Sequence, residues 1–181
     1  MNVRPALMAA CLIPAPLTAQ SFDEAVWTNT SIAVQLCLQE HPSGAARAGA
    51  FRASGFAETV ERSTTNADTT HVFTAPAQTV TAELYYGEMP QHCFVETRHL
   101  GVTGMSQMLD AIIPRLFPSY VRIADQGAVD PATGQPALCV RYEDPANPIG
   151  HVVGAATLDP TPNQTGCVDN GTSSLYSSYR V

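Results

Sequence analysis

The chain has 181 residues and a formal net charge of −7, and its nine basic residues are all arginine. This length is sufficient for one globular domain with a hydrophobic core of its own. The acidic balance disfavours nucleic acid and anionic lipid as partners and favours cationic ones, because like charges repel at long range.

The N-terminal segment predicts a secretory signal peptide. Arg4 supplies a positive start, residues 5–17 are uncharged and mostly apolar, and Ala19 is a small residue at the expected cleavage point. The apolar stretch is shorter than the ~20 residues of a spanning helix, and prolines interrupt it. We therefore expect residues 1–19 to be removed, leaving 20–181 as a single globular domain, periplasmic or secreted, with no transmembrane segment.

Four cysteines remain after the predicted cleavage: Cys37, Cys93, Cys139 and Cys167. An even number of cysteines in an exported chain indicates disulfides, with three connectivities open. We expect Cys37–Cys93 and Cys139–Cys167, because each bridge then stays within one half of the chain. The spacings fit no zinc module. In an alternative interpretation, Cys11 belongs to a loose lipoprotein cleavage box and is lipidated.

The first half of the mature chain predicts two helices and then strands. The run Thr28–Thr30 is rich in residues that begin helices, and the apolar spacing after it continues to His41, before a proline. Ser43 is a candidate N-cap for a second helix over Gly44–Ser54, with Gly55 at its end. Polar–apolar alternation predicts strands over 56–61, 71–74, 80–86 and 93–97, the last two forming a hairpin.

The pattern starts again at residue 103. Thr103 is a candidate N-cap for a helix in which one face is apolar and Pro114 kinks or ends the last turn. That face comprises Met105, Met108, Leu109, Ile112 and Leu116. Strands are predicted over 120–124, 137–142, 151–157 and 175–179. The chain therefore predicts an α+β fold in which an antiparallel sheet carries helices on one face. Two organisations stay open: a single irregular domain without duplication, or two tandem α-β-β-β-β halves over residues 28–100 and 103–181.

No catalytic, cofactor or metal motif stands out. His92 and His99 would point to opposite faces of a strand and so make a poor metal pair. The segment around Ser106 lacks the final glycine of a nucleophile elbow, and there is no glycine-rich phosphate loop. We expect no cofactor and no metal, and the sequence does not favour an enzyme.

The candidate binding residues are aromatic or lie beside a long hairpin loop. Tyrosine offers a large contact area and a hydroxyl, which suits interfaces. The residues are Tyr85, Tyr86, His92, Tyr176 and Tyr179. These features predict a disulfide-bonded binding or accessory protein of the cell envelope, without catalytic activity, that meets another envelope protein of basic character. The alternatives are a small envelope hydrolase with a cleft between the two halves and a structural component of the envelope.

Overall fold

The computed structural model of the chain describes residues 20–62, 69–86, 92–124, 138–147, 150–160 and 166–179. The predicted signal peptide, Cys11 and the turn of the predicted hairpin at 87–91 lie outside these ranges. Within them the chain forms three α-helices and eight strands in one open antiparallel sheet. The predicted α+β class, with an antiparallel sheet, is therefore confirmed.

The first helix begins earlier than the sequence pattern predicted. Helix α1 spans Phe22–Leu38, six residues ahead of the expected start at Thr28. The N-cap is Ser21, whose side chain accepts a hydrogen bond from the Glu24 N–H. A serine followed three residues later by glutamate is a known helix-start pattern, and it satisfies an N–H group that the first turn would otherwise leave unpaired.

The second helix, α2, spans Gly44–Ala53 and follows the prediction closely. Ser43 is the N-cap and accepts a hydrogen bond from the Ala46 N–H, while Gly55 takes a positive φ of 86° just beyond the helix. Glycine adopts this left-handed conformation without steric cost, so it ends the helix cleanly. The strands that follow are β1 (Ala57–Arg62), β2 (Thr69–Thr74), β3 (Thr81–Tyr86) and β4 (Cys93–Thr97), with a short 3₁₀ turn, η1 (Pro76–Gln78), between β2 and β3.

Helix α3 spans Val102–Leu116, and its predicted N-cap was wrong. The N-cap position is Gly101, which has no side chain, and Thr103 lies inside the first turn. Asp169, from a distant loop, accepts a hydrogen bond from the Thr103 N–H at 3.1 Å. A carboxylate at a helix N-terminus is favourable, because the free N–H groups there carry partial positive charge.

The predicted apolar face of α3 is confirmed. Met105, Met108, Leu109 and Ile112 are buried, and Pro114 lies in the last turn. The strands after it are β5 (Val121–Ala124), β6 (Val140–Glu143), β7 (His151–Ala156) and β8 (Ser173–Tyr179).

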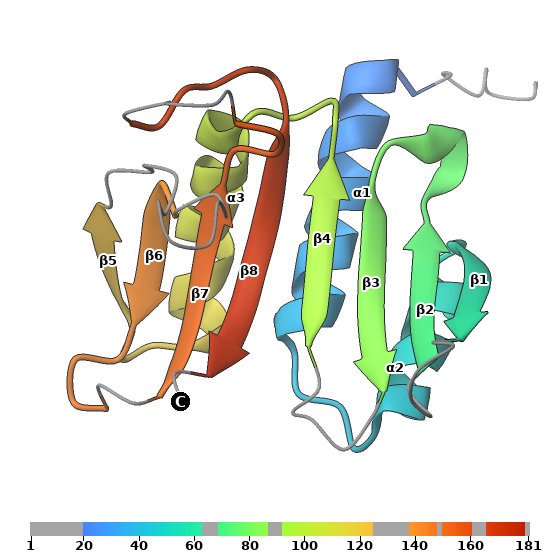
Figure 1. Ribbon diagram of the computed structural model, residues 1–181, viewed down its shortest axis with the longest axis horizontal. Coiled ribbons are helices and arrows are strands. Elements are labelled where there is room, and N and C mark those ends of the chain that lie inside the picture. Colours follow the sequence, from blue (N-terminus) through green and yellow to red (C-terminus); the bar gives the residue numbers. More distant parts are fainter. Residues whose placement is uncertain are drawn as a thin grey trace, which may run out of the picture.

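The sheet has the order β1-β2-β3-β4-β8-β7-β6-β5, and every neighbouring pair is antiparallel. Each half contributes four strands in meander order, and β4 and β8 join the two halves in the middle. All three helices cover the same face of the sheet, so the opposite face carries no helix (Figure 1). Helices therefore precede four strands in each half, two helices in the first half and one in the second; that the two halves superpose stays a prediction.

The hydrophobic core lies between the sheet and the helices. One cluster of buried side chains extends from Phe51 and Phe73 in the first half to Tyr142 and Leu175 in the second. No helix in the described ranges is long and apolar enough to cross a membrane.

Both disulfides have the predicted pairing. Cys37–Cys93 joins α1 to β4, and Cys139–Cys167 joins the residue before β6 to the loop before β8; the Cα atoms are 5.4 Å apart in each. Two disulfides fit a protein that folds in an oxidising compartment outside the cytosol.

Candidate functional site

The face of the sheet that carries no helix presents three rows of side chains across β2, β3 and β4. Directly opposite residues of antiparallel strands point to the same side, so the strand register defines each row. The hydrogen bond from the Tyr85 N–H to the His92 carbonyl, 3.2 Å, fixes the row nearest the 86–92 connection. The rows are Thr70–Tyr85–His92, Val72–Glu83–Phe94 and Thr74–Thr81–Glu96.

Residues from all three rows surround a hollow of about 510 Å³, here called the lower hollow. It is lined by Thr70, Glu83, Tyr85, His92, Phe94 and Glu96. Two aromatic rings and two carboxylates thus face the same space, and the chain supplies them from adjacent strands. Such a combination suits a ligand that has an apolar body and a positive charge.

A second hollow of about 650 Å³, here called the upper hollow, lies where β3 begins and β4 ends. Glu96 lines both hollows. The lining of the upper hollow is more polar and includes Arg98 and His99, together with Phe22 from α1 and Leu158 from the loop after β7. Together the two hollows form what we call the sheet-face groove.

The carboxyl group of Glu96 is partly buried in this groove. Burial is the main cause that raises the pKa of its carboxyl group above the ordinary value, and the negative charge of Glu83 raises it further. Arg98 opposes this shift, and Asp159 adds to it. A cation placed between Glu83 and Glu96 would offset the charge repulsion that contributes to the raised pKa of Glu96.

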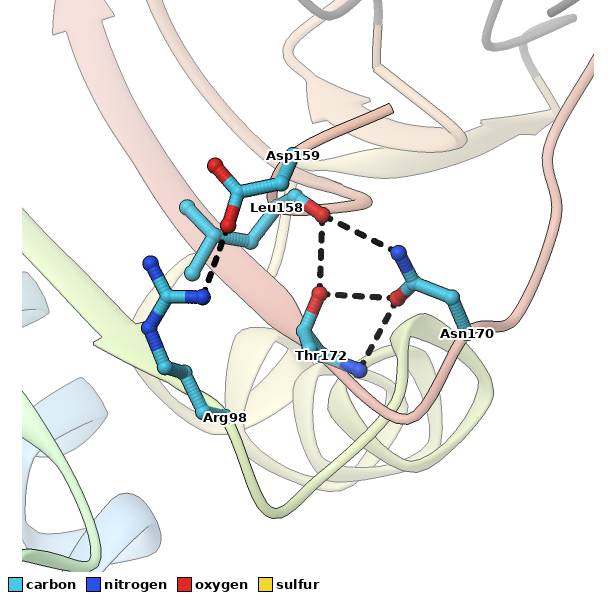
Figure 2. Close-up of polar contacts among 5 residues, drawn as sticks. All are labelled: Arg98, Leu158, Asp159, Asn170 and Thr172. Carbon is cyan, nitrogen blue, oxygen red and sulfur yellow. Dashed lines mark hydrogen bonds and ion pairs between the residues drawn. The ribbon is translucent and has the colours of Figure 1, made fainter. Parts of the chain in front are cut away.

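An ion pair borders the upper hollow and connects the two halves. Arg98 Nη1 lies 2.7 Å from Asp159 Oδ2 (Figure 2). The loop that carries Asp159 is held to the start of β8: the Leu158 carbonyl accepts hydrogen bonds from Asn170 Nδ2 at 3.2 Å and from the Thr172 hydroxyl at 2.8 Å. Because both partners of the ion pair are largely exposed, the pair itself adds little stability. Its effect is to place the loop, and with it Leu158, against the upper hollow.

Backbone strain gathers around the same hollow. In the described part of the chain, the non-glycine residues with positive φ are Ala77 (57°), Gln78 (55°) and Asp159 (54°). Ala77 and Gln78 line the upper hollow, and Asp159 is paired with Arg98, which also lines it. Left-handed conformations of such residues are unfavourable and are often retained at functional sites.

A separate polar cluster lies on the helix-covered side, where β7 begins and β8 ends. His151 Nε2 lies 2.8 Å from Ser177 Oγ, and His151 Nδ1 lies 3.2 Å from the Tyr120 hydroxyl. Burial lowers the pKa of His151, so the neutral imidazole is favoured. With the proton on Nδ1, the Nε2 atom accepts the hydrogen bond of Ser177, which is the arrangement that activates a serine hydroxyl.

The edge of the sheet beside α2 carries a third cluster. Glu58 lies between Arg52 and His71: its Oε2 atom is 2.6 Å from Arg52 Nη1, and its Oε1 atom is 2.5 Å from His71 Nδ1. The hydrogen bond from His71 is the main cause that lowers the pKa of Glu58, against the opposing effect of burial, with Arg52 as a further contribution. This cluster fixes α2 against β1 and β2, since each residue comes from a different element.

The structure brings some of the predicted binding residues together. Tyr85 and His92 line the lower hollow, and Tyr176 lies on the same open face in β8, 40% exposed. Tyr86 and Tyr179 belong to β3 and β8, but their side chains lie outside the described part.

Other members of the sites were not found from the sequence. Phe94, Glu83 and Glu96 join Tyr85 only through the pairing of three strands, for which alternation within one strand gives no signal. The residues Tyr120, His151 and Ser177 likewise meet through tertiary packing. Among the residues described, no group of three or more histidine, cysteine, aspartate or glutamate side chains could hold a metal ion.

Comparison of the chain with protein-family models, with curated proteins and with solved structures found no match.

Proposed function

We propose that this chain is an exported, periplasmic binding or accessory protein that acts by holding a basic segment of another envelope protein in the sheet-face groove. The observation that carries this proposal is the lower hollow, where aromatic and acidic side chains from β3 and β4 face one space on the side of the sheet that carries no helix. The signal peptide predicted from residues 1–19 supports the location.

The dimensions and charge of the groove support a polypeptide ligand. Strand β3 is six residues long, so a groove that follows it extends for about 20 Å, which is the length of an extended segment of roughly six residues. The mature chain has eight arginines against sixteen acidic residues, so its net charge also attracts a basic partner.

Salt dependence and paired variants test this function. Purified mature protein should bind a basic envelope protein at low salt and bind it more weakly at physiological salt, because charges more than ~10 Å apart are screened at 0.1 M. Tyr85→Ala should weaken binding by about 1–2 kcal/mol if the ring is an anchor. The matched control is Trp27→Ala on α1, which removes an aromatic ring that is 43% exposed outside the groove. Equal effects of the two variants would contradict the proposal.

Export is tested separately. Intact-mass measurement of the protein from its native host should give a chain that begins near Gln20. A full-length mass would contradict the signal peptide, and a diacylglycerol adduct on Cys11 would replace it with the lipoprotein interpretation.

A second function, ester or amide hydrolysis, is favoured by the contact between His151 and Ser177. In this reaction the Ser177 Oγ atom would attack an acyl carbon while its proton passes to His151 Nε2 and then to the leaving group. A water molecule would then attack the acyl-serine ester, its proton passing through His151 back to the Ser177 Oγ atom as the acid is released. The cluster lies within 103–181 rather than between the two halves, so it differs in place from the cleft that the sequence suggested. Covalent labelling by a fluorophosphonate that Ser177→Ala abolishes would support hydrolysis. Absence of labelling in the unmodified protein would count against it.

A further inference from the structure

Within the proposed function, we infer that the lower hollow is a site for the side-chain ammonium of a lysine in the partner polypeptide, with Glu83 and Glu96 as its counter-ions and the rings of Tyr85 and Phe94 around its alkyl chain. This statement rests on the binding function proposed above and adds the chemical group that the hollow recognises. It depends on how the strand register arranges the two carboxylates.

Glu83 and Glu96 come from adjacent strands and stand in adjacent rows of the same face. Glu83 is directly opposite Phe94, and Glu96 is two residues further along β4, opposite Thr81. Diagonal neighbours of this kind have Cα atoms ~7–8 Å apart, so two glutamate side chains can approach one common point from different directions. Thr70, on the third strand, adds a hydroxyl acceptor to the same hollow.

This arrangement suits an ammonium better than a guanidinium. An ammonium is a compact charge with three donors that can point toward separate acceptors. A guanidinium is planar and gains most from one carboxylate that takes two parallel hydrogen bonds. Because the acceptors in the lower hollow stand on different strands, the ammonium can bond to both carboxylates at once.

The aromatic rings supply the remaining part of the site. Tyr85 and Phe94 line the hollow and are half-buried, so each ring is partly open to the space between the carboxylates. Aromatic faces attract cations and also cover the methylene groups of a lysine stem. Norleucine, which has the same stem without the charge, would use the rings alone.

The charged groups around the hollow favour one cation at this position. Glu83 faces it from β3, Glu96 from β4 and His92 from the residue before β4, while Arg98 and Asp159 form an ion pair at the far end of the groove. A bound ammonium relieves the repulsion between the two glutamates, which is one reason why the pKa of Glu96 is raised. Binding should therefore weaken as pH falls through the pKa of Glu96, because protonation removes one counter-ion.

The experiment uses the mature protein and short peptides that carry one variable residue. Acetylated and amidated peptides of alanine and serine with a single central lysine, arginine, norleucine or acetyl-lysine are titrated into ¹⁵N-labelled protein at low salt. The lysine peptide should shift the amide signals of residues 83–85 and 92–96. Norleucine and acetyl-lysine should bind about tenfold more weakly, the size expected when one partly desolvated charge contact is lost, and arginine should bind several-fold more weakly than lysine.

Variants of the protein locate the effect. Glu96→Gln should weaken binding of the lysine peptide about tenfold and reduce its dependence on pH, while leaving the circular dichroism spectrum unchanged. The matched control is Glu40→Gln, an exposed carboxylate after α1 and outside the groove, which should bind like the unmodified protein.

Each contrary result overturns a defined part of the inference. If lysine and norleucine peptides bind equally, or if the shifts fall outside the lower hollow, the ammonium site is wrong even where a basic envelope protein still binds the groove. If butylamine binds as tightly as the lysine peptide, the ligand is a free amine and the polypeptide source is wrong. If no basic protein binds the groove at all, the proposed function itself fails.

Discussion

Gly101→Ala tests how the N-terminus of α3 is stabilised. Asp169 reaches this helix from 66 residues away, and its Oδ2 atom accepts a hydrogen bond from the Thr103 N–H at 3.1 Å. An added Cβ on Gly101 would lie 1.7 Å from Asp169 Oδ1 and 2.5 Å from its Cγ, so the carboxylate must leave. The backbone of Gly101 has φ −71° and ψ 169°, which alanine adopts without strain, so steric exclusion of Asp169 is the only cost.

The magnitude follows from the loss of a helix cap. Loss of a capping side chain costs ~1 kcal/mol, within a range of about 0.5–2 kcal/mol. Alanine in place of glycine otherwise gains roughly 0.4–1 kcal/mol by restricting the unfolded chain. We therefore expect Gly101→Ala to lower the free energy of unfolding by up to about 1 kcal/mol, but to raise it slightly in an Asp169→Ala background. The resulting coupling between the two positions equals the contribution of the cap, about 0.5–2 kcal/mol.

Urea unfolding followed by circular dichroism at 222 nm measures this cycle with disulfides intact. The fall in the free energy of unfolding at low pH provides a second measurement of this contact. Hydrogen bonding from Thr103 is the main cause that lowers the pKa of Asp169 below its ordinary 3.8. The stabilisation of the folded protein by the Asp169 carboxylate is therefore complete above pH 3.8 and is lost as pH falls through the lower folded-state pKa. In Asp169→Ala this part of the pH dependence should be absent. Additive effects of the two substitutions would refute the capping role of Asp169.

Three further predictions concern the turn, the disulfides and the sheet edge. Ala77→Gly should raise the free energy of unfolding by about 0.5–1 kcal/mol in urea titrations, because φ of 57° is unfavourable for alanine and not for glycine. Mild dithiothreitol under native conditions should open Cys139–Cys167 before the other disulfide, because Cys167 is exposed, and alkylation with mass spectrometry identifies the bridge. Glu58→Gln should lower the free energy of unfolding at pH 7 and make it less dependent on pH in acid. The folded-state pKa of Glu58 is lowered, so the ionised carboxylate stabilises the protein at pH 7, and this stabilisation is lost as pH falls through that pKa. Thermal unfolding at several pH values measures the effect.

Controls and contrary outcomes are specific to each prediction. The control for Ala77→Gly is Ala111→Gly, at an exposed position inside α3. This substitution should lower the free energy of unfolding by about 1 kcal/mol, so the same chemical change has effects of opposite sign at the two positions. A destabilising Ala77→Gly would argue against strain in the turn. If Cys37–Cys93, whose two cysteines are buried, were reduced before Cys139–Cys167, the argument from exposure would be contradicted. If Glu58→Gln left the dependence of stability on acid pH unchanged, the Glu58 carboxylate would not contribute to the stability of the sheet edge beside α2.

Features that depend on residues close in the chain could be predicted from the sequence. The buried face of α3 repeats at helical spacing, and Ser43 with Gly55 marks both ends of α2. Alternation within each segment located the strands, and the location of one cysteine pair in each half gave the disulfide pairing.

Features that depend on tertiary contacts could not be predicted in the same way. Asp169 replaces Thr103 as the group that caps α3, and nothing near residue 103 indicates this. The start of α1 is marked by residues close in the chain, because Ser21 and Glu24 have the spacing of a helix start, whereas the N-cap residues from Thr28 predicted a later start. In the groove, Tyr85 and His92 were identified singly, but the register that sets Glu96 beside them is a property of the sheet.

Site-specific photo-crosslinking tests the proposed function most directly. The protein carries p-benzoylphenylalanine in place of Phe94, inside the lower hollow, or in place of Trp27 on α1, and is irradiated in envelope extract at low salt. We expect position 94 to form a crosslink to a basic protein that disappears at physiological salt and in Glu83→Gln, while position 27 forms none. Crosslinks that are equal at both positions, or insensitive to salt and to Glu83→Gln, would contradict a binding function for the sheet-face groove.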